Sequence, residues 1–249
     1  MKDSSYIRVN NLEMKYDDYT VIKNLTFSVK KGEIFVVMGG SGCGKSTLLK
    51  HLIGLITPTK GQIFYDDVDF VNTDPDQRKE FLTQFGVSYQ NGALWTSMTL
   101  YENVSLVLEQ HTTLATDEIS EIVNLKLAMV GLKGFEEYYP SEISGGMRKR
   151  AGLARAMALD PKILFFDEPS AGLDPINSKR LDDLILEIKD NIGTTIIVVT
   201  HELESIFAIA DNSIFLDPDT KTMIAEGNPH HLLKHSNNPK VIQFLKRST

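Results

Sequence analysis

The sequence predicts an α/β fold with a parallel sheet at its core, an antiparallel β layer at its N-terminal end, and a helical insertion in its middle. The first strand-like runs follow one another without a helix between them, which favours antiparallel pairing. From residue 33 onward, strand-like and helix-like segments alternate, which is typical of a parallel sheet. Residues 98–160 contain no strand-like run, and breaks at Gly131, Gly134 and Pro140 divide them into helices.

The expected strands are short apolar or alternating runs bounded by turn residues. They are YIRV (6–9), LTFSV (25–29), EIFVVM (33–38), GQIFY (61–65), ILFF (163–166) and IIVV (196–199). One helix is clear from its periodicity, because residues 177–191 place Leu181, Leu184, Ile185 and Ile188 on one face.

The length of 249 residues and the hydrophobic content of 42% fit one domain with a sizeable core. We expect a single domain over 1–249, with its core at about 1–90 and 161–249 and a helical subdomain at about 91–160. The short C-terminal tail, 237–249, carries Val241 and Phe244 among other apolar residues. These side chains are too apolar to stay in water, so we expect the tail to pack as a short helix, on its own domain or on a second copy.

Charge and hydropathy limit the partners. The net charge of −7 argues against a nucleic-acid partner, because phosphate backbones are held by positive surface. The one basic cluster is predicted to be a solvated helix face. It consists of Arg148, Lys149, Arg150 and Arg155. No tract is long and apolar enough to span a bilayer, and the first residues do not resemble a secretory signal, so we expect a cytoplasmic protein.

A glycine-rich loop between the strand EIFVVM and a following helix predicts a phosphate-binding loop (P-loop). The loop fits the pattern G-x-x-x-x-G-K-[ST] from Gly39 to Ser46. We expect Lys45 to meet the β- and γ-phosphates of a nucleotide and Ser46 to bind Mg²⁺. Cys43 is expected to be a small residue in a crowded loop. The predicted nucleotide-binding residues here are Gly39, Gly40, Ser41, Gly42, Cys43, Gly44, Lys45, Ser46 and Thr47.

Two carboxylates follow the buried strand ILFF. Asp167 ends this strand, where it can hold Mg²⁺, and Glu168 comes directly after it. A kinase places its acceptor at this position, so the pair Asp-Glu favours hydrolysis, with Glu168 orienting or deprotonating a water molecule. A P-loop followed by this pair predicts a P-loop NTPase core that binds a nucleoside triphosphate with Mg²⁺ and hydrolyses it.

The order GGSGCGKST, ISGGM, ILFFDEPSAGLD resembles the nucleotide-binding subunit of ABC transporters over nearly the whole chain. The resemblance implies roles for four further residues. Tyr16 would stack on adenine, with Tyr19 as the alternative, and Gln90 would contact Mg²⁺ and link to the membrane subunit. Asp174 would lie at a dimer interface, and His201 would contact the γ-phosphate.

A second anion-binding sequence, EISGGMRKR at 142–150, opens with a hydroxyl and two glycines at the start of a helix. The family resemblance implies that Ser144, Gly145 and Gly146 close over the nucleotide on the other subunit's P-loop. Each chain would then contain half of two sites, and the functional unit would be a homodimer. The family's usual fourth residue is Gln, and Met147 replaces it here, so a polar side-chain contact is lost.

Three features are similar to the ATPases of Mla- and Mce-type lipid-trafficking systems: Ser-Gly-Gly-Met, the segment QNGALW that begins at Gln90, and the ending NPKVIQFLK. That resemblance implies a peripheral protein on the cytoplasmic side of the inner membrane. Its partners would be an integral membrane permease and an MCE-domain lipid-binding protein, and its activity would drive phospholipid transport between bacterial membranes. ATPases for another cargo remain the alternative.

Two other interpretations are weaker. Soluble ABC ATPases that act on DNA carry a long coiled coil, and those that act on ribosomes carry two cassettes; this sequence has neither pattern. A P-loop kinase would leave ISGGM, Asp174 and His201 unexplained. Trp95, the only tryptophan, follows Gln90 closely. Its position is compatible with a docking surface for the membrane partner and equally with the core of the helical insertion.

Overall fold

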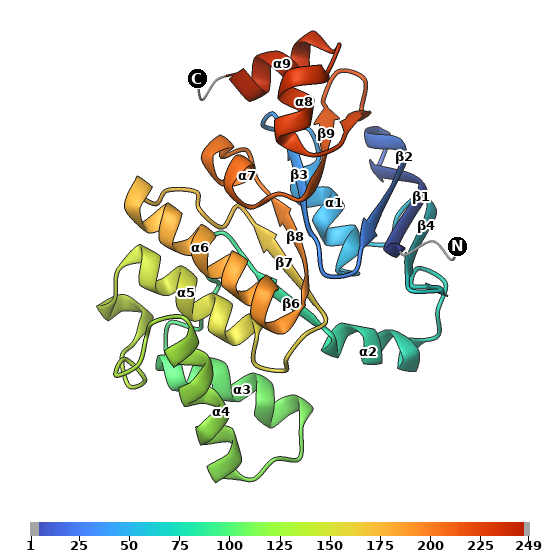
Figure 1. The fold of residues 1–249 in the computed structure, drawn as a ribbon. Coiled ribbons are helices and arrows are strands. Elements are labelled where there is room, and N and C mark those ends of the chain that lie inside the picture. The colour runs from blue at the N-terminus through green and yellow to red at the C-terminus, as the bar shows by residue number, and fades with distance from the viewer. Residues whose placement is uncertain (1–4, 247–249) are drawn as a thin grey trace.

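The computed structural model describes residues 5–246, which form two β-sheets and the helices around them (Figure 1). The first sheet is antiparallel, in the order β2-β1-β4-β5. Its strands are β1 (Ser5–Tyr16), β2 (Tyr19–Lys30), β4 (Lys60–Tyr65) and β5 (Val68–Asp69). The predicted antiparallel layer is therefore confirmed, and it contains three of the four early runs; EIFVVM joins the other sheet.

The second sheet has the order β10-β9-β3-β8-β7-β6, and every pair from β9 to β6 is parallel. Only the edge strand β10 is antiparallel to its neighbour. The strands are β3 (Ile34–Gly39), β6 (Phe85–Ser88), β7 (Ile163–Asp167), β8 (Thr195–Val199), β9 (Asn212–Asp217) and β10 (Thr222–Glu226). This is the predicted parallel core, and its middle strands β3, β7 and β8 are almost entirely buried, as expected of a sheet covered on both faces.

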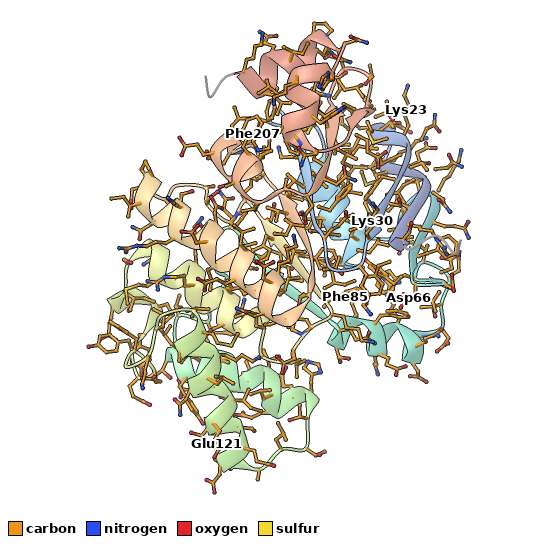
Figure 2. The ribbon with its side chains drawn as sticks, in the orientation of Figure 1. Lys23, Lys30, Asp66, Phe85, Glu121 and Phe207 are labelled. Atoms are coloured by element: carbon orange, nitrogen blue, oxygen red, sulfur yellow. The ribbon has the colours of Figure 1, made fainter. Side chains whose placement is uncertain are left out.

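Two hydrophobic cores lie on opposite faces of this parallel sheet. One core lies between the two sheets and includes Leu48, Leu49 and Leu52 of α1 (Lys45–Leu52). Its aromatic corner includes Phe85, the first residue of β6, which Figure 2 labels; its ring centroid lies 4.8 Å from that of Tyr65. The other core packs the outer face of the sheet against helices.

Apart from α1, the helices outside the 91–160 segment cover the ends and the outer face of the sheet. They are α2 (Pro75–Thr83), α6 (Pro175–Ile192), α7 (Leu203–Ile209), α8 (Pro229–His235) and α9 (Pro239–Leu245). In α6, Leu181, Ile185 and Ile188 are buried and Leu184 is half-buried, which confirms the predicted helix and its apolar face. Within residues 5–246, no helix combines the length and apolar character needed to cross a bilayer.

Every regular element within residues 91–160 is a helix, as predicted. These elements are α3 (Leu100–His111), α4 (Thr116–Met129), the short 3-10 helix η1 (Pro140–Glu142) and α5 (Gly145–Ala156). They gather at one end of the molecule beside β6, where Glu121 projects from the outer side of α4 (Figures 1 and 2). A reciprocal cap between Thr99 and Glu102 begins α3, so the sequence itself fixes where the helical segment starts.

The prediction that the basic cluster is a solvated helix face is wrong. All four side chains donate hydrogen bonds to backbone carbonyls of neighbouring segments, and Lys149 is buried. Arg155 donates to the carbonyls of Gly92 and Ala93 at 3.0 and 2.6 Å. The physical reason is that the loops beside α5 carry carbonyl groups without partners in regular structure, and cations on long side chains can satisfy them.

The tail forms a helix that packs on its own chain. Val241 and Leu245 of α9 are fully buried in the outer core, and Ile242 is half-buried. Lys240 pairs with the buried carboxylate of Asp217 at the end of β9, at 2.8 Å. The expected helix and its packing within the chain are confirmed, while residues 247–249 of the expected tail lie outside the described residues.

One carboxyl group is buried without full compensation. The side chain of Asp182 in α6 is 4% exposed; its Oδ2 accepts a hydrogen bond from the Ser205 hydroxyl at 2.9 Å, and its Oδ1 has no partner among the described residues. Burial raises the pKa of Asp182 to about 6, against the opposing hydrogen bond from Ser205. The folded protein therefore holds a proton here more tightly than the unfolded chain does.

This shift predicts a pH-dependent cost to stability. The cost is absent below the unfolded pKa near 4, grows as the pH rises, and is complete above the folded pKa of about 6. Asp182→Asn removes the charge and keeps an acceptor for Ser205. We expect it to raise the free energy of unfolding by about 2 kcal/mol at pH 8, and by much less near pH 4. Urea unfolding at both pH values measures this, and an equal gain at both would contradict it.

Candidate nucleotide-binding and hydrolysis site

The P-loop connects the end of β3 to the start of α1 and needs glycine at two points. Gly39 has φ 152°, and a Cβ there would lie 2.5 Å from the carbonyl oxygen of Leu216 in β9. Gly44 has φ 100°, and its Cβ would lie 2.8 Å from Val21 in β2. A larger residue at either point would push the loop away from the strands that hold it. The Cys43 side chain is buried, as predicted for a crowded loop.

Lys45 begins α1 and turns its ammonium back over the loop. Its Nζ donates to the carbonyls of Gly39 and Gly40 at 3.0 and 3.2 Å, and it lies 3.8 Å from Oε1 of Glu168. Its side chain is 8% exposed. A cation held at the mouth of a glycine loop, beside the free N–H groups at a helix N-terminus, forms a site for an anion.

Ser46 and Asp167 form the pair that fits a magnesium ion. The hydroxyl of Ser46 donates to Oδ1 of Asp167 at 3.0 Å, across the gap between α1 and the end of β7. Burial raises the pKa of Asp167; the nearby charge of Glu168 adds to the rise and the Ser46 hydrogen bond opposes it. A cation beside this carboxylate would relieve that cost. Hydroxyl and carboxylate oxygens are ligands that Mg²⁺ prefers, so these two residues fit the ion.

Glu168 and His201 are in direct contact. Glu168 follows β7 in a left-handed conformation, with φ 50°, and its backbone N–H donates to the carbonyl of Val199 at 2.8 Å. Its Oε1 lies 2.8 Å from Nδ1 of His201, and its Oε2 accepts from the His201 backbone N–H at 3.3 Å. The strained turn and these contacts aim the carboxylate at one point beside Lys45, which is the arrangement that a water-orienting base needs.

These groups surround one open cavity of about 570 Å³. Its lining residues are Tyr16, Tyr19, Val21, Ser41, Gly42, Gly44, Lys45, Ser46, Thr47, Gln90, Glu168 and His201. The structure thus brings together the predicted aromatic, phosphate-binding, glutamine, glutamate and histidine residues from five separate segments. Both Tyr16 and Tyr19 line the cavity, so the choice between them for adenine stacking stays open. Asp167 does not line the cavity but accepts a hydrogen bond from Ser46, which does. Gly39, Gly40 and Cys43 belong to the loop without lining the cavity.

The second predicted anion site lies elsewhere on the chain. Ser144 caps α5, its hydroxyl accepting from the backbone N–H of Met147 at 3.2 Å, and the residues that line the described cavity include none of Ser144, Gly145 and Gly146. A Cβ on Gly146 would lie 3.7 Å from Asn177 in α6, which places the two helix starts side by side. Asp174 caps α6, and the hydrogen bond from the Asn177 side chain lowers its pKa. Both motifs therefore share one exposed surface.

Sequence reasoning missed two residues at these sites. Val21 lines the cavity. The only feature of the sequence that could have indicated this is the alternation of strand β2, in which the side chain of Val21 points to the opposite face from the buried Ile22. Lys149 joins α5 to the turn after Glu168, because its Nζ donates to the carbonyls of Pro169 and Ala171 at 2.7 and 2.6 Å. Nothing in the sequence distinguishes this lysine from its basic neighbours.

The fold, the P-loop and the capped glycine motif define an ATP-binding cassette, and residues 22–171 match the ABC transporter family. The chain belongs to this family. It is 41% identical over 244 residues to the intermembrane phospholipid transport system ATP-binding protein MlaF of Haemophilus influenzae, covering 98% of this chain and 91% of that protein. It is 44% identical to a probable ribonucleotide transport ATP-binding protein, mkl, of Mycobacterium tuberculosis; this match covers 96% of the chain but only 66% of that relative's length.

Solved structures support the same class. The structure of cbiO1 from Clostridium perfringens, part of the ABC transporter complex cbiONQ, matches with a TM-score of 0.85 and 27% identity, covering 97% of this chain and 94% of that one. The dimeric, post-hydrolysis structure of the ATP-binding cassette MJ0796 bound to ADP and Pi matches with a TM-score of 0.80 and 27% identity, covering 89% of this chain and 98% of that one. The predicted fold class is therefore confirmed.

The position of Glu168 predicts separate effects on binding and on turnover. Glu168→Gln keeps the shape of the side chain but removes its basic oxygen, so we expect kcat for Mg-ATP to fall about 100-fold or more, in the range seen for loss of a general base. ATP affinity should stay within about twofold, because the P-loop groups are unchanged. Steady-state turnover and binding of a fluorescent ATP analogue measure the two quantities.

Glu204→Gln is the matched control, since Glu204 is exposed and lies on α7 rather than in the cavity. It should keep kcat within about twofold of the unsubstituted protein. Normal turnover by Glu168→Gln would assign the base to another residue.

Proposed function

We propose that this chain is the ATP-hydrolysing subunit of an ABC transporter that works as a homodimer and drives an integral membrane permease. The observation that carries the proposal is the convergence of Lys45, Glu168 and His201 on one cavity. In this proposal the chain lies on the cytoplasmic side of the inner membrane. Residues 91–160 act as the helical subdomain, and residues 1–90 and 161–249 as the core.

The mechanism follows from what each side chain can do. Lys45 exchanges the carbonyls of Gly39 and Gly40 for the β- and γ-phosphate oxygens of ATP. Bound Mg²⁺, held by Ser46, Asp167 and Gln90, would neutralise the phosphate charge that develops during transfer. Glu168 orients a water molecule and accepts its proton, while His201 holds the glutamate and donates toward the γ-phosphate.

A second copy is needed to complete each site in this proposal. Ser144 and the helix N-terminus behind it do not line the chain's own cavity, yet they offer the hydroxyl and the backbone N–H groups that suit a phosphate. A symmetric pair would place this motif over the partner's P-loop, with Asp174 at the same surface. ATP would then bridge the copies, and loss of the γ-phosphate would release them.

Phospholipid is the proposed cargo, moved between bacterial membranes with an MCE-domain protein as a further partner. The support is the similarity to MlaF, which extends over 98% of the chain. The mycobacterial relative is named for ribonucleotide transport, and ribonucleotide is therefore the competing cargo. No nucleic-acid partner is proposed, because the charge is −7 and the basic side chains of α5 are bound to the protein's own carbonyls.

Trp95 is the best-supported contact with the permease. Its side chain is 59% exposed, so the structure does not support the interpretation that it belongs to the core of the helical segment. Its backbone is nevertheless rigidly held, because the buried side chain of Asn103 accepts from the Trp95 N–H at 2.7 Å and donates to its carbonyl at 3.0 Å. A large aromatic side chain on a fixed backbone loses little entropy when a partner covers it.

The shared site predicts complementation between two inactive chains. Lys45→Ala removes the phosphate cation, and Ser144→Arg fills the second motif with a bulky side chain, so each homodimer should lack turnover. A mixed dimer contains one intact site, formed by the P-loop of the Ser144→Arg chain and the Ser144 motif of the Lys45→Ala chain. Equal mixing should restore about a quarter of normal turnover, since half of the dimers are mixed and each has one working site.

Ser141→Arg is the matched control for steric effects, because Ser141 is exposed three residues before Ser144. It should retain turnover as a homodimer. The complex of the Glu168→Gln protein with ATP provides a second check, in which Ser144 lies within hydrogen-bonding reach of the γ-phosphate on the partner's P-loop. Ser144 on its own chain's nucleotide in that complex would contradict the shared site.

The partner and the cargo are tested in membranes. Trp95→Ala should keep ATP affinity and folding but release the chain from its permease, whereas Leu125→Ala, with a similarly exposed side chain (58%) on α4, should not. Mass spectrometry of the native membrane complex then identifies the partners and the bound small molecules. A permease that copurifies with an MCE-domain protein and phospholipid supports the proposed cargo. A ribonucleotide other than ATP or ADP that copurifies in place of lipid would replace it.

A further inference from the structure

A chain of three buried polar side chains lies beneath the candidate hydrolysis site. The hydroxyls of Ser170 and Ser205 are 3.0 Å apart, and the Ser205 hydroxyl lies 2.9 Å from Oδ2 of Asp182. All three residues are at least nine-tenths buried. Ser205 has one proton, which it donates to the carboxylate, so Ser170 donates to Ser205. The order of donation is therefore Ser170 to Ser205 to Asp182.

Two of the three residues lie on the segments that follow Glu168 and His201. The third lies on α6, whose start forms part of the exposed surface with Ser144 and Asp174. Ser170 is two residues past Glu168, and the buried Lys149 holds the carbonyls on either side of it. Ser205 lies in the first turn of α7, four residues past His201. Asp182 lies in α6, the helix that Asp174 caps. The chain of hydrogen bonds thus joins the turn after Glu168 to the helix after His201, and both to α6.

We propose that Asp182 is a positioning residue for ATP hydrolysis: through Ser205 and Ser170 it holds the start of α7, and with it His201, in register with Glu168. The proposal rests on the roles of Glu168 and His201 under the proposed function. The 2.8 Å contact between Nδ1 of His201 and Oε1 of Glu168 joins residues 33 positions apart in the sequence. The Glu168 carboxylate also accepts from the His201 backbone N–H. Among the described residues, the Ser170–Ser205 hydrogen bond is a further side-chain link between the turn after Glu168 and the helix after His201.

The burial of Asp182 supports this role. A carboxyl group with one unpaired oxygen costs stability in an apolar core, and the acidic neighbours Asp183 and Glu204 add to that cost. An apolar side chain in α6 would fill the same place without the cost. A carboxylate does what an apolar group cannot do: it accepts a strong, directional hydrogen bond from Ser205 and so fixes which way that hydroxyl points.

The experiment compares Asp182→Ala, Asp182→Asn and Ser205→Ala with the unsubstituted chain. Asp182→Ala and Ser205→Ala should lower kcat for Mg-ATP about tenfold, because small displacements of catalytic groups are costly, while KM stays within about twofold. Asp182→Asn keeps an acceptor oxygen and should restore most of kcat. Asp183→Ala, at the exposed neighbouring position, should match the unsubstituted protein.

The imidazole NMR resonances of His201 give a readout that does not need turnover. They should shift in Asp182→Ala and return in Asp182→Asn, with binding of a fluorescent ATP analogue confirming that each variant is folded. A folded Asp182→Ala protein with unchanged His201 resonances or unchanged kcat overturns the proposal, and so does an Asp182→Asn protein as impaired as Asp182→Ala. Lack of turnover by the unsubstituted chain would instead defeat the proposed function, and the resonances would still decide the role of Asp182.

Discussion

The register of three parallel strands is the constraint on which the site depends. Val37 in β3 pairs with Val199 in β8, and Val199 pairs with Asp167 in β7, so the carboxyl ends of the three strands stop side by side. The segments that follow them carry Lys45, at the start of α1, and Glu168 and His201, in the turns after β7 and β8. A shift of one strand by one residue would turn its side chains to the other face and separate these groups. The packing of the sheet between two hydrophobic cores is what prevents such a shift.

Local patterns made most of the fold and the composition of the site predictable. The P-loop, the acidic pair and the helix cap at Ser144 are each encoded by neighbouring residues, and their chemistry follows from residue type. The interactions that were not predicted join distant segments. The contacts of the α5 cations were misassigned because a sequence does not show which loop carbonyls lack partners. Asp182 was overlooked because the helical pattern of α6 identifies apolar positions only.

For Trp95 and for the tail, the sequence is compatible with two environments, and the packing of the folded chain distinguishes between them. An apolar residue is compatible with a core or with an interface until its neighbours are known. Asn103 takes the buried place next to Trp95 and uses its amide to hold the loop, so the indole is left at the surface. In the tail, the outer core of the chain accepts Val241 and Leu245, so a second copy is not required to bury them.

Helix α5 links the chain's own cavity to the surface proposed to contact a second copy, because its start and its side contact different segments. At its start, Gly146 packs near Asn177, beside Asp174. Along its side, Gly152 is so close to the loop after Gln90 that a Cβ there would lie 2.7 Å from the Cα of Gly92, and Arg155 holds the same loop by two carbonyls. Because the contact is backbone against backbone, the loop and the helix cannot move independently by much. A displacement of Gln90 at the chain's own cavity would therefore be carried to Ser144, at the surface proposed to close the partner's site.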